Sequence, residues 1–125
     1  MIEALYQEEG YALIGAAFEV HSVLGGGMAE EIYQESLEIE LQLRAIPFSS
    51  KPPLKVKYKS QLLPKTYFPD LVVHEHIMVE LKTVAALLPE HEAQLINYLR
   101  ITEKSVGYLI NFEPRAKLEW KRFVV

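Results

Sequence analysis

The sequence predicts a mixed α/β domain in which helices flank a sheet that contains both parallel and antiparallel strands. Three observations support this prediction. Residues 67–82 read as two apolar strands joined by a short polar turn, residues 28–44 and 90–103 have helical spacing, and a buried apolar run at 106–112 follows the second of these helices. A tight turn joins antiparallel strands, whereas a helical crossover joins parallel strands, so the sheet is expected to be mixed.

Length and composition indicate one domain. The chain has 125 residues, half of them apolar, so residues 1–125 can bury a single core. Because it has no cysteine, it can form neither disulfides nor thiolate metal sites, which fits a cytoplasmic protein. It has no signal-peptide pattern and no apolar run of the ~18 residues that span a membrane, so no membrane partner is expected.

The charge is distributed unevenly along the chain. The net charge is −4, but residues 1–46 carry nine Glu against one Arg, a net charge of −8. Residues 47–125 carry twelve basic and eight acidic side chains, a net charge of +4. This asymmetry allows a basic face on an acidic protein.

Two helices are expected first, from residue 3 to about residue 23 and from about 28 to 44, separated by three glycines at 25–27. Glutamates at the start of the second helix complement its dipole, which is one explanation for Glu30. Glu30 and Tyr33 also share a helix face just after the glycine turn, which could direct a carboxylate inward. Both interpretations stay open.

Residues 47–66 are expected to be extended. Lys55, Lys57 and Lys59 alternate with apolar residues, so the three lysines should lie on one face of a strand. Lysines commonly protect an edge strand from pairing with another chain, which explains the pattern without a ligand. A ribbon that contacts nucleic-acid phosphates is the functional alternative.

The charged residues within 67–82 are unusual for strands. Asp70 interrupts the first strand, while Glu80 and Lys82 share one face of the second. If the strands pair through their turn, two carboxylates and one ammonium converge on one point. Charges inside a sheet are normally paired or bind a metal, and carboxylate pairs suit Mg²⁺. A Glu80–Lys82 ion pair on a solvated face is the alternative.

After the hairpin, Pro89 is expected to open a helix that runs from 90 to about 103, followed by strands at 106–112 and 118–125. Gln94 and Tyr98 are four residues apart and share a face of this helix. They are either a surface Gln beside a partly buried Tyr or a functional pair. The predicted order is therefore helix, helix, three strands, helix, strand, strand.

Three segments together resemble the PD-(D/E)XK nuclease superfamily. Pro69-Asp70, nine further residues and Glu80-Leu81-Lys82 resemble its signature. Residues 94–98 (QLINY) are similar to the QxxxY element of its RecB-type branch, and residues 27–33 (GMAEEIY) are similar to the GxxExxY motif of a small bacterial family in this superfamily. The resemblance covers nearly the whole chain and implies a restriction-endonuclease-like core of order αβββαβ over residues 28–112.

The resemblance also implies roles for individual residues. Asp70 and Glu80 would bind Mg²⁺ or Mn²⁺, with the Leu81 carbonyl as a third ligand and Glu30 reaching the ion directly or through water. Lys82 would hold the attacking water and help to deprotonate it, or would contact the scissile phosphate.

Gln94 and Tyr98 would orient the site and hold the phosphate backbone. Further candidates for contact with the substrate are Tyr33, Lys55, Lys57 and Lys59. The primary hypothesis is a metal-dependent nuclease that hydrolyses DNA, or RNA as the second choice. The alternative is a non-catalytic nuclease-fold module that binds nucleic acid or a partner protein, and a third reading is a phosphatase acting on small phosphoesters. A homodimer stays open.

Overall fold

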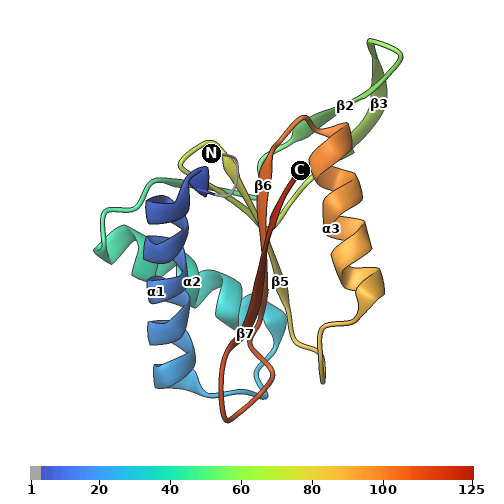
Figure 1. The fold of residues 1–125 in the computed structure, drawn as a ribbon. Coiled ribbons are helices and arrows are strands. Elements are labelled where there is room, and N and C mark those ends of the chain that lie inside the picture. Colours follow the sequence, from blue (N-terminus) through green and yellow to red (C-terminus); the bar gives the residue numbers. More distant parts are fainter. Residues whose placement is uncertain (1–3) are drawn as a thin grey trace.

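The computed structural model describes residues 4–125 and contains three helices and seven strands within that range. They are α1 (Gln7–Leu24), α2 (Glu30–Leu43), β1 (Phe48–Ser50), β2 (Leu54–Tyr58), β3 (Gln61–Tyr67), β4 (Leu71–Val73), β5 (Ile77–Lys82), α3 (Pro89–Ile101), β6 (Val106–Asn111) and β7 (Glu119–Val124). The helices α1 and α2 lie on one side of the central sheet, and α3 lies on the other (Figure 1). The first residue of the helix expected from residue 3 lies outside the described residues.

The central sheet has five strands in the order β1-β4-β5-β6-β7. The β4–β5 hairpin is antiparallel, with Leu71 opposite Val79, and β5 pairs with β6 in parallel across α3, with Glu80 opposite Leu109. The mixed sheet and the hairpin turn at 74–76 are therefore confirmed. The elements α2, β1, β4, β5, α3 and β6 form the expected αβββαβ core.

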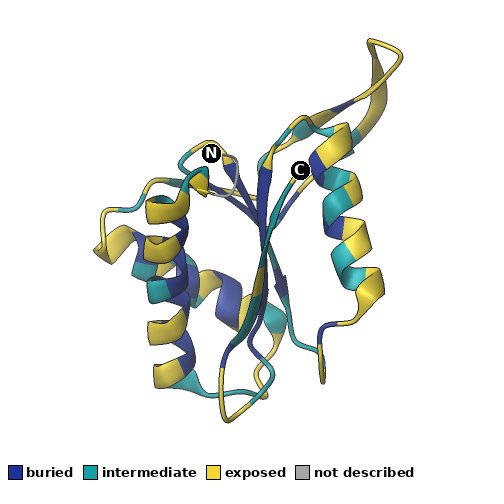
Figure 2. Cartoon of the chain, viewed as in Figure 1, coloured by how far each residue is buried: buried dark blue, intermediate teal, exposed yellow. Residues whose placement is uncertain are grey.

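Two apolar cores lie on the two faces of this sheet. Ile77, Val79 and Leu81 of β5 pack into the core beneath α1 and α2. Met78 faces the other way and packs with Leu95 of α3. The central strands are accordingly buried between helices whose outer faces are exposed (Figure 2). Because side chains alternate along a strand, the even-numbered Glu80 and Lys82 lie on the α3 side with Met78.

The segment between α2 and β4 differs from the expected single extended stretch. It contains β1 and then β2 and β3, which pair with each other as a separate two-stranded ribbon inserted into the core order. The ribbon turns at Lys59 and Ser60, both of which have positive φ (49° and 70°). Asn-Gly normally occupies such a turn, so the sequence lacked the usual hairpin signal. Tyr67, expected in the hairpin's first strand, instead ends β3.

The prediction that three lysines lie on one face of a strand is also wrong for one of them, Lys59. Lys55 and Lys57 line the same small hollow beside the end of α3, but Lys59 lies in the turn. Its ammonium lies 5.5 Å from the centre of the Tyr58 ring. A residue with φ of 49° leaves the strand geometry, so it no longer continues the alternation.

The glycine turn at 25–27 connects α1 to α2. A Cβ on Gly26 would lie 2.1 Å from the Glu113 carbonyl oxygen, so only glycine fits against the loop before β7. The Tyr33 hydroxyl donates to the Gly25 carbonyl at 2.5 Å and accepts from the Met28 amide at 3.1 Å. The turn therefore fixes where α2, and with it Glu30, begins. No helix within residues 4–125 is long and apolar enough to cross a membrane.

Candidate functional site

Asp70 and Glu80 are brought together by the hairpin, as the sequence predicted. Asp70 directly precedes β4, and its backbone amide donates to Oε1 of Glu80 at 2.9 Å. The Leu81 amide donates to Oδ2 of Asp70 at 2.7 Å. Each carboxylate is thus held by the backbone of the neighbouring strand, which fixes both side chains relative to the sheet.

Burial makes the negative charge of these carboxylates costly. It raises the pKa of Glu80 to about 7, with the nearby Asp70 as the second cause. Burial also raises the pKa of Asp70, against the lowering effects of the Leu81 amide, Lys51 and Lys82. Two carboxylates in these positions favour a bound cation, which would relieve their mutual repulsion.

Glu30 reaches the same area from the first residue of α2. Together with Asp70 it lines a hollow of about 170 Å³, whose other lining residues are Glu31, Gln34 and Lys51. Burial raises the pKa of Glu30, Asp70 raises it further, and Lys82 lowers it. The charges of Asp70 and Lys82 therefore affect the pKa of Glu30. Of the two interpretations of Glu30, a carboxylate directed toward the site fits this geometry.

Lys82 lies close enough to influence all three carboxylates electrostatically, and it lowers the pKa of Glu30, Asp70 and Glu80. The alternative of a direct Glu80–Lys82 ion pair is not found: among the residues described, no carboxylate lies within 4 Å of the Lys82 ammonium. The ammonium is therefore not engaged in a contact ion pair with the carboxylates beside it.

Tyr98 of α3 is connected to the site through Tyr67. The two rings are stacked with their centres 3.6 Å apart. The Tyr67 hydroxyl is buried near the Glu80 carboxylate and lowers its pKa, although no acceptor meets regular hydrogen-bond geometry. Burial and the charge of Glu80 in turn raise the pKa of Tyr67. Gln94 is exposed and shares a hollow of about 450 Å³ with Tyr98.

Other candidates do not join this group. Tyr33 is fully buried, its ring stacks on Phe112 at 4.6 Å, and its hydroxyl serves the glycine turn. The structure therefore places Tyr33 in the core, away from any exposed substrate. Lys55, Lys57 and Lys59 lie on the β2–β3 ribbon, where Lys57 pairs with Glu103 at 3.7 Å.

Sequence reasoning missed three residues at the site. Gln34 donates to the Asp70 carbonyl at 2.8 Å, and Lys51 lines the hollow with Glu30. Tyr67 is the third, described above. Gln34 could have been noticed because it lies four residues, one helical turn, after Glu30. Lys51 and Tyr67 carried no comparable signal, because their positions depend on the ribbon.

A second polar cluster lies beyond the end of β5. The side-chain amide of the fully buried Asn111 accepts from the Val84 amide at 3.0 Å and donates to the Val84 carbonyl at 2.8 Å. Glu119 accepts from Asn111 at 2.9 Å and from the Leu87 amide at 3.1 Å. These bonds hold the connection between Lys82 and α3 against β6 and β7.

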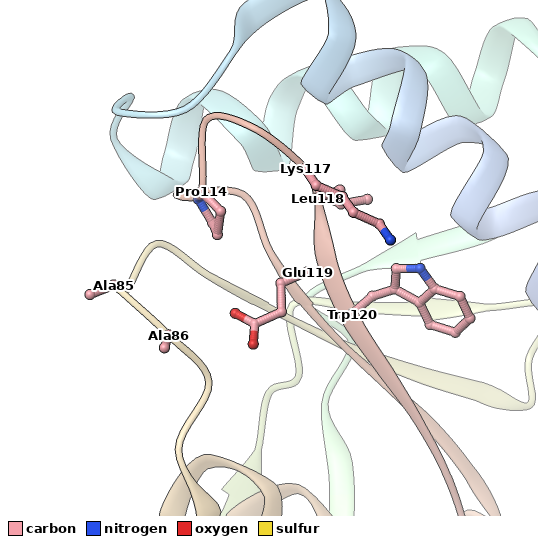
Figure 3. A pocket seen from close by; sticks show the side chains of 7 residues that line it. All are labelled: Ala85, Ala86, Pro114, Lys117, Leu118, Glu119 and Trp120. Carbon is pink, nitrogen blue, oxygen red and sulfur yellow. The ribbon is translucent and has the colours of Figure 1, made fainter.

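Glu119 also lines a hollow of about 500 Å³, where Figure 3 shows its carboxylate on the side of Ala85 and Ala86. This hollow is larger than the one beside Asp70, but Glu119 is the single carboxylate that lines it, and that carboxylate is already hydrogen-bonded. The smaller hollow, beside Asp70, is therefore the better candidate for a functional site.

The donor set at Asp70 and Glu80 fits a hard divalent cation, because it consists of half-buried carboxylate oxygens that repel each other. It is incomplete as a protein cage: within residues 4–125, no three Asp, Glu, His or Cys side chains form a ready group of metal ligands. Magnesium commonly keeps several waters and takes only one or two carboxylates, so this set is compatible with it.

The comparison with protein families settles the classification. Residues 7–123 match the sequence model of the PD-(D/E)XK nuclease superfamily. The chain belongs to this superfamily. No curated protein matches the sequence. The matched range includes Asp70, Glu80 and Lys82.

A solved structure supports the fold. The crystal structure of SSO0001 is similar with a TM-score of 0.59 and 18% identity, over 75% of this chain and 48% of that one. The chain thus spans about half the length of SSO0001. An alkaline exonuclease from Laribacter hongkongensis, LHK-Exo, is similar with a TM-score of 0.49 and 13% identity, over 86% of this chain and 75% of that one. The restriction-endonuclease-like fold class expected from the sequence is confirmed.

Proposed function

We propose that this chain is a metal-dependent nuclease that hydrolyses phosphodiester bonds of DNA, with RNA as the second choice. The observation that carries the proposal is the pair of backbone hydrogen bonds that holds the half-buried carboxylates of Asp70 and Glu80 together near Lys82. Membership of a nuclease superfamily supports the same reaction class.

In this proposal Mg²⁺ or Mn²⁺ is held by the carboxylates of Asp70 and Glu80 and the carbonyl of Leu81, and Glu30 contributes directly or through a water. When bound, such an ion supplies a Lewis acid that polarises the phosphoryl oxygen and acidifies water near neutral pH. The support from this chain is the pKa of Glu80, which burial, and then the charge of Asp70, raises to about 7. A cation in that place would favour the charged carboxylates.

In the proposed reaction, Lys82 acts on the attacking water or on the scissile phosphate. Its ammonium would orient the attacking oxygen, help to remove its proton, or hold a non-bridging oxygen of the scissile phosphate. The support is its electrostatic proximity to all three carboxylates and the absence of a contact ion pair within the described residues. Gln94 and Tyr98 would orient the site and hold the phosphate backbone, Tyr98 through its stack on Tyr67.

Within the superfamily, we assign the chain to the bacterial GxxExxY family and the RecB-type branch. The glycine turn, Glu30 and Tyr33 support the first assignment, because they connect one tight turn to a carboxylate at the site. The Gln94–Tyr98 spacing on α3 supports the second. We also propose a cytoplasmic location, which the lack of cysteine in the sequence fits.

The deciding experiment is cleavage of plasmid and single-stranded DNA with Mg²⁺ or Mn²⁺, using Glu80→Ala and Lys82→Ala. Both variants should lose at least about 100-fold in rate. Glu75→Ala and Lys117→Ala remove exposed charges away from the site and serve as matched controls that keep full activity. Calorimetry should show that Lys82→Ala still binds the divalent ion, whereas Glu80→Ala does not. Wild-type protein that neither cleaves nor binds metal would refute the proposal.

A non-catalytic module that binds nucleic acid or a partner protein is the second candidate. The observation that favours it is the lack of a ready group of three ligand side chains among residues 4–125. The two candidates differ in their response to Lys82→Ala. Binding by the module should tolerate this change, whereas cleavage by the enzyme should not.

A further inference from the structure

The β2–β3 ribbon is attached to the rest of the chain at one end. At its base, Leu54 is paired with Tyr67, and both side chains pack against the core under α3. Farther along, the Lys57–Glu103 ion pair fastens the ribbon beside the C-terminal end of α3. The turn at Lys59 and Ser60 extends past that end of α3 and away from the sheet (Figure 1). The base adjoins the proposed site, because Tyr67 lies beside Glu80.

The outer part of the ribbon combines positive charge with exposed apolar surface. Residues 54–67 contain four lysines and no acidic residue: Lys55, Lys57, Lys59 and Lys65. Tyr58 is 64% exposed, and Leu62 and Leu63 are exposed beside it. Lysines alone would explain protection of an edge, but they do not explain a largely exposed aromatic ring beside the turn.

We infer that the ribbon binds an unpaired segment of the nucleic-acid strand that enters the site, with lysines on its phosphates and a base stacked on Tyr58. This inference rests on the proposed function, because it requires the same strand to reach Glu80. Proteins that bind single-stranded nucleic acid commonly combine positive charge with exposed aromatic rings, because the unpaired bases expose flat faces that stack on such rings. Paired bases keep those faces covered within the duplex, so they would leave Tyr58 without a partner.

The length of the ribbon gives the size of this contact. Lys59 at the turn comes five positions after Leu54 at the base, which corresponds to about 16 Å at ~3.3 Å per residue. That distance accommodates about five nucleotides at the ~3.4 Å spacing of a stacked strand, or fewer if the strand is extended. An unpaired tail of about five nucleotides should therefore suffice for contact with Tyr58.

The test is binding in EDTA, where no cleavage occurs, to a labelled single strand, a blunt duplex and the same duplex with an unpaired tail. Tyr58→Ala should weaken binding of the single strand and the tailed duplex by roughly 5- to 150-fold, as loss of one stacked base predicts. Binding of the blunt duplex should change little. Tyr58→Phe keeps the ring and should keep the affinity.

Matched controls come from the chain itself. Tyr11 on α1 is 65% exposed, almost the same as Tyr58, so Tyr11→Ala should leave every affinity unchanged. Lys59→Ala should lower the slope of log affinity against log salt by about 0.7 for the single strand, whereas Lys117→Ala should not. Lys82→Ala should abolish cleavage but should keep the higher affinity of tailed over blunt duplex, which separates the ribbon from the proposed chemistry.

Ribbon-dependent binding without any metal-dependent cleavage would refute the nuclease and support the ribbon. Cleavage lost in Lys82→Ala but binding unaffected by Tyr58→Ala would overturn the ribbon inference alone. Equal loss of affinity for blunt and tailed DNA, no binding of any oligonucleotide, or self-association abolished by Tyr58→Ala would also overturn it. The last result would assign the exposed tip to a second copy of the chain.

Discussion

The Asp70 amide donates a hydrogen bond to Glu80, and the Leu81 amide returns one to the Asp70 carboxylate. The pair is ten residues apart in sequence but is held in one register, in which Leu71 lies opposite Val79. A slip of one residue would turn the Glu80 side chain to the other face of the sheet. The two carboxylates can therefore occupy one place only if the hairpin forms in this register.

The raised pKa of Glu80 predicts how stability depends on pH in the absence of metal. The folded-state pKa of about 7 exceeds the ordinary value of 4.5, so the folded protein binds the extra proton between these values. Stability is therefore greatest below about pH 4.5 as far as Glu80 is concerned, and it is lost as the pH rises through about 7. Urea unfolding in EDTA should show a fall of the order of 2–3 kcal/mol from this group.

Glu80→Gln should flatten this part of the pH profile, since the amide does not titrate. Added Mg²⁺ should stabilise the wild-type protein more at about pH 8 than at about pH 6, because metal and proton compete for the carboxylate. An equally steep profile in Glu80→Gln would show that the pH dependence arises elsewhere.

The Tyr67 hydroxyl should affect Glu80 without supporting the fold. Tyr67→Phe removes the group that helps to stabilise the charged carboxylate, so the pKa of Glu80 should rise further. The stack on Tyr98 stays, and the hydroxyl lacks a regular hydrogen bond, so the free energy of unfolding should change by less than about 1 kcal/mol. A carbon-detected NMR titration of the Glu80 carboxyl measures the shift. An unchanged or lower pKa would contradict the coupling.

Gly26 and Gly15 should respond to alanine in opposite directions. A Cβ at Gly26 would lie 2.1 Å from a backbone oxygen, so Gly26→Ala should reduce the free energy of unfolding by about 2 kcal/mol or more. Gly15 lies within α1, where a Cβ would come no closer than 3.4 Å to the flexible Arg44 side chain. Gly15→Ala should therefore stabilise by about 0.5–1 kcal/mol. Urea unfolding of both variants checks the pair, and equal effects would contradict the close approach at Gly26.

Asn111 should be more important for stability than a surface asparagine. Asn111→Ala leaves the Val84 amide and carbonyl without their side-chain partner and deprives Glu119 of one donor. The expected loss is about 2–3 kcal/mol in urea unfolding, because buried polar groups lose their hydrogen bonds. Asn97 is exposed on α3, so Asn97→Ala should change stability by at most about 0.5 kcal/mol. Similar losses in both variants would mean that the buried network contributes little.

Much of the site was predictable because its residues lie in one local element. Asp70, Glu80 and Lys82 belong to a hairpin whose short turn fixes their register, and alternation alone places Glu80 and Lys82 on one face. The sequence did not predict Lys51 and Tyr67, because both belong to the region of the ribbon, whose turn lacks glycine and whose second strand contains Pro64. It also assigned Tyr33 to the substrate, since helical spacing alone does not distinguish the two sides of α2.

By itself, the sequence determined the αβββαβ core, the mixed sheet and the meeting of Asp70 and Glu80 at the end of one hairpin. These follow from periodicity and turn lengths, which act over a few residues. Only the tertiary structure decided that Glu30 joins Asp70 at one hollow and that the Tyr33 hydroxyl closes a glycine turn. It also decided that Tyr67 connects Glu80 to α3. Those relationships depend on how helices pack on the sheet, and packing joins residues whose separation along the chain carries no periodic signal.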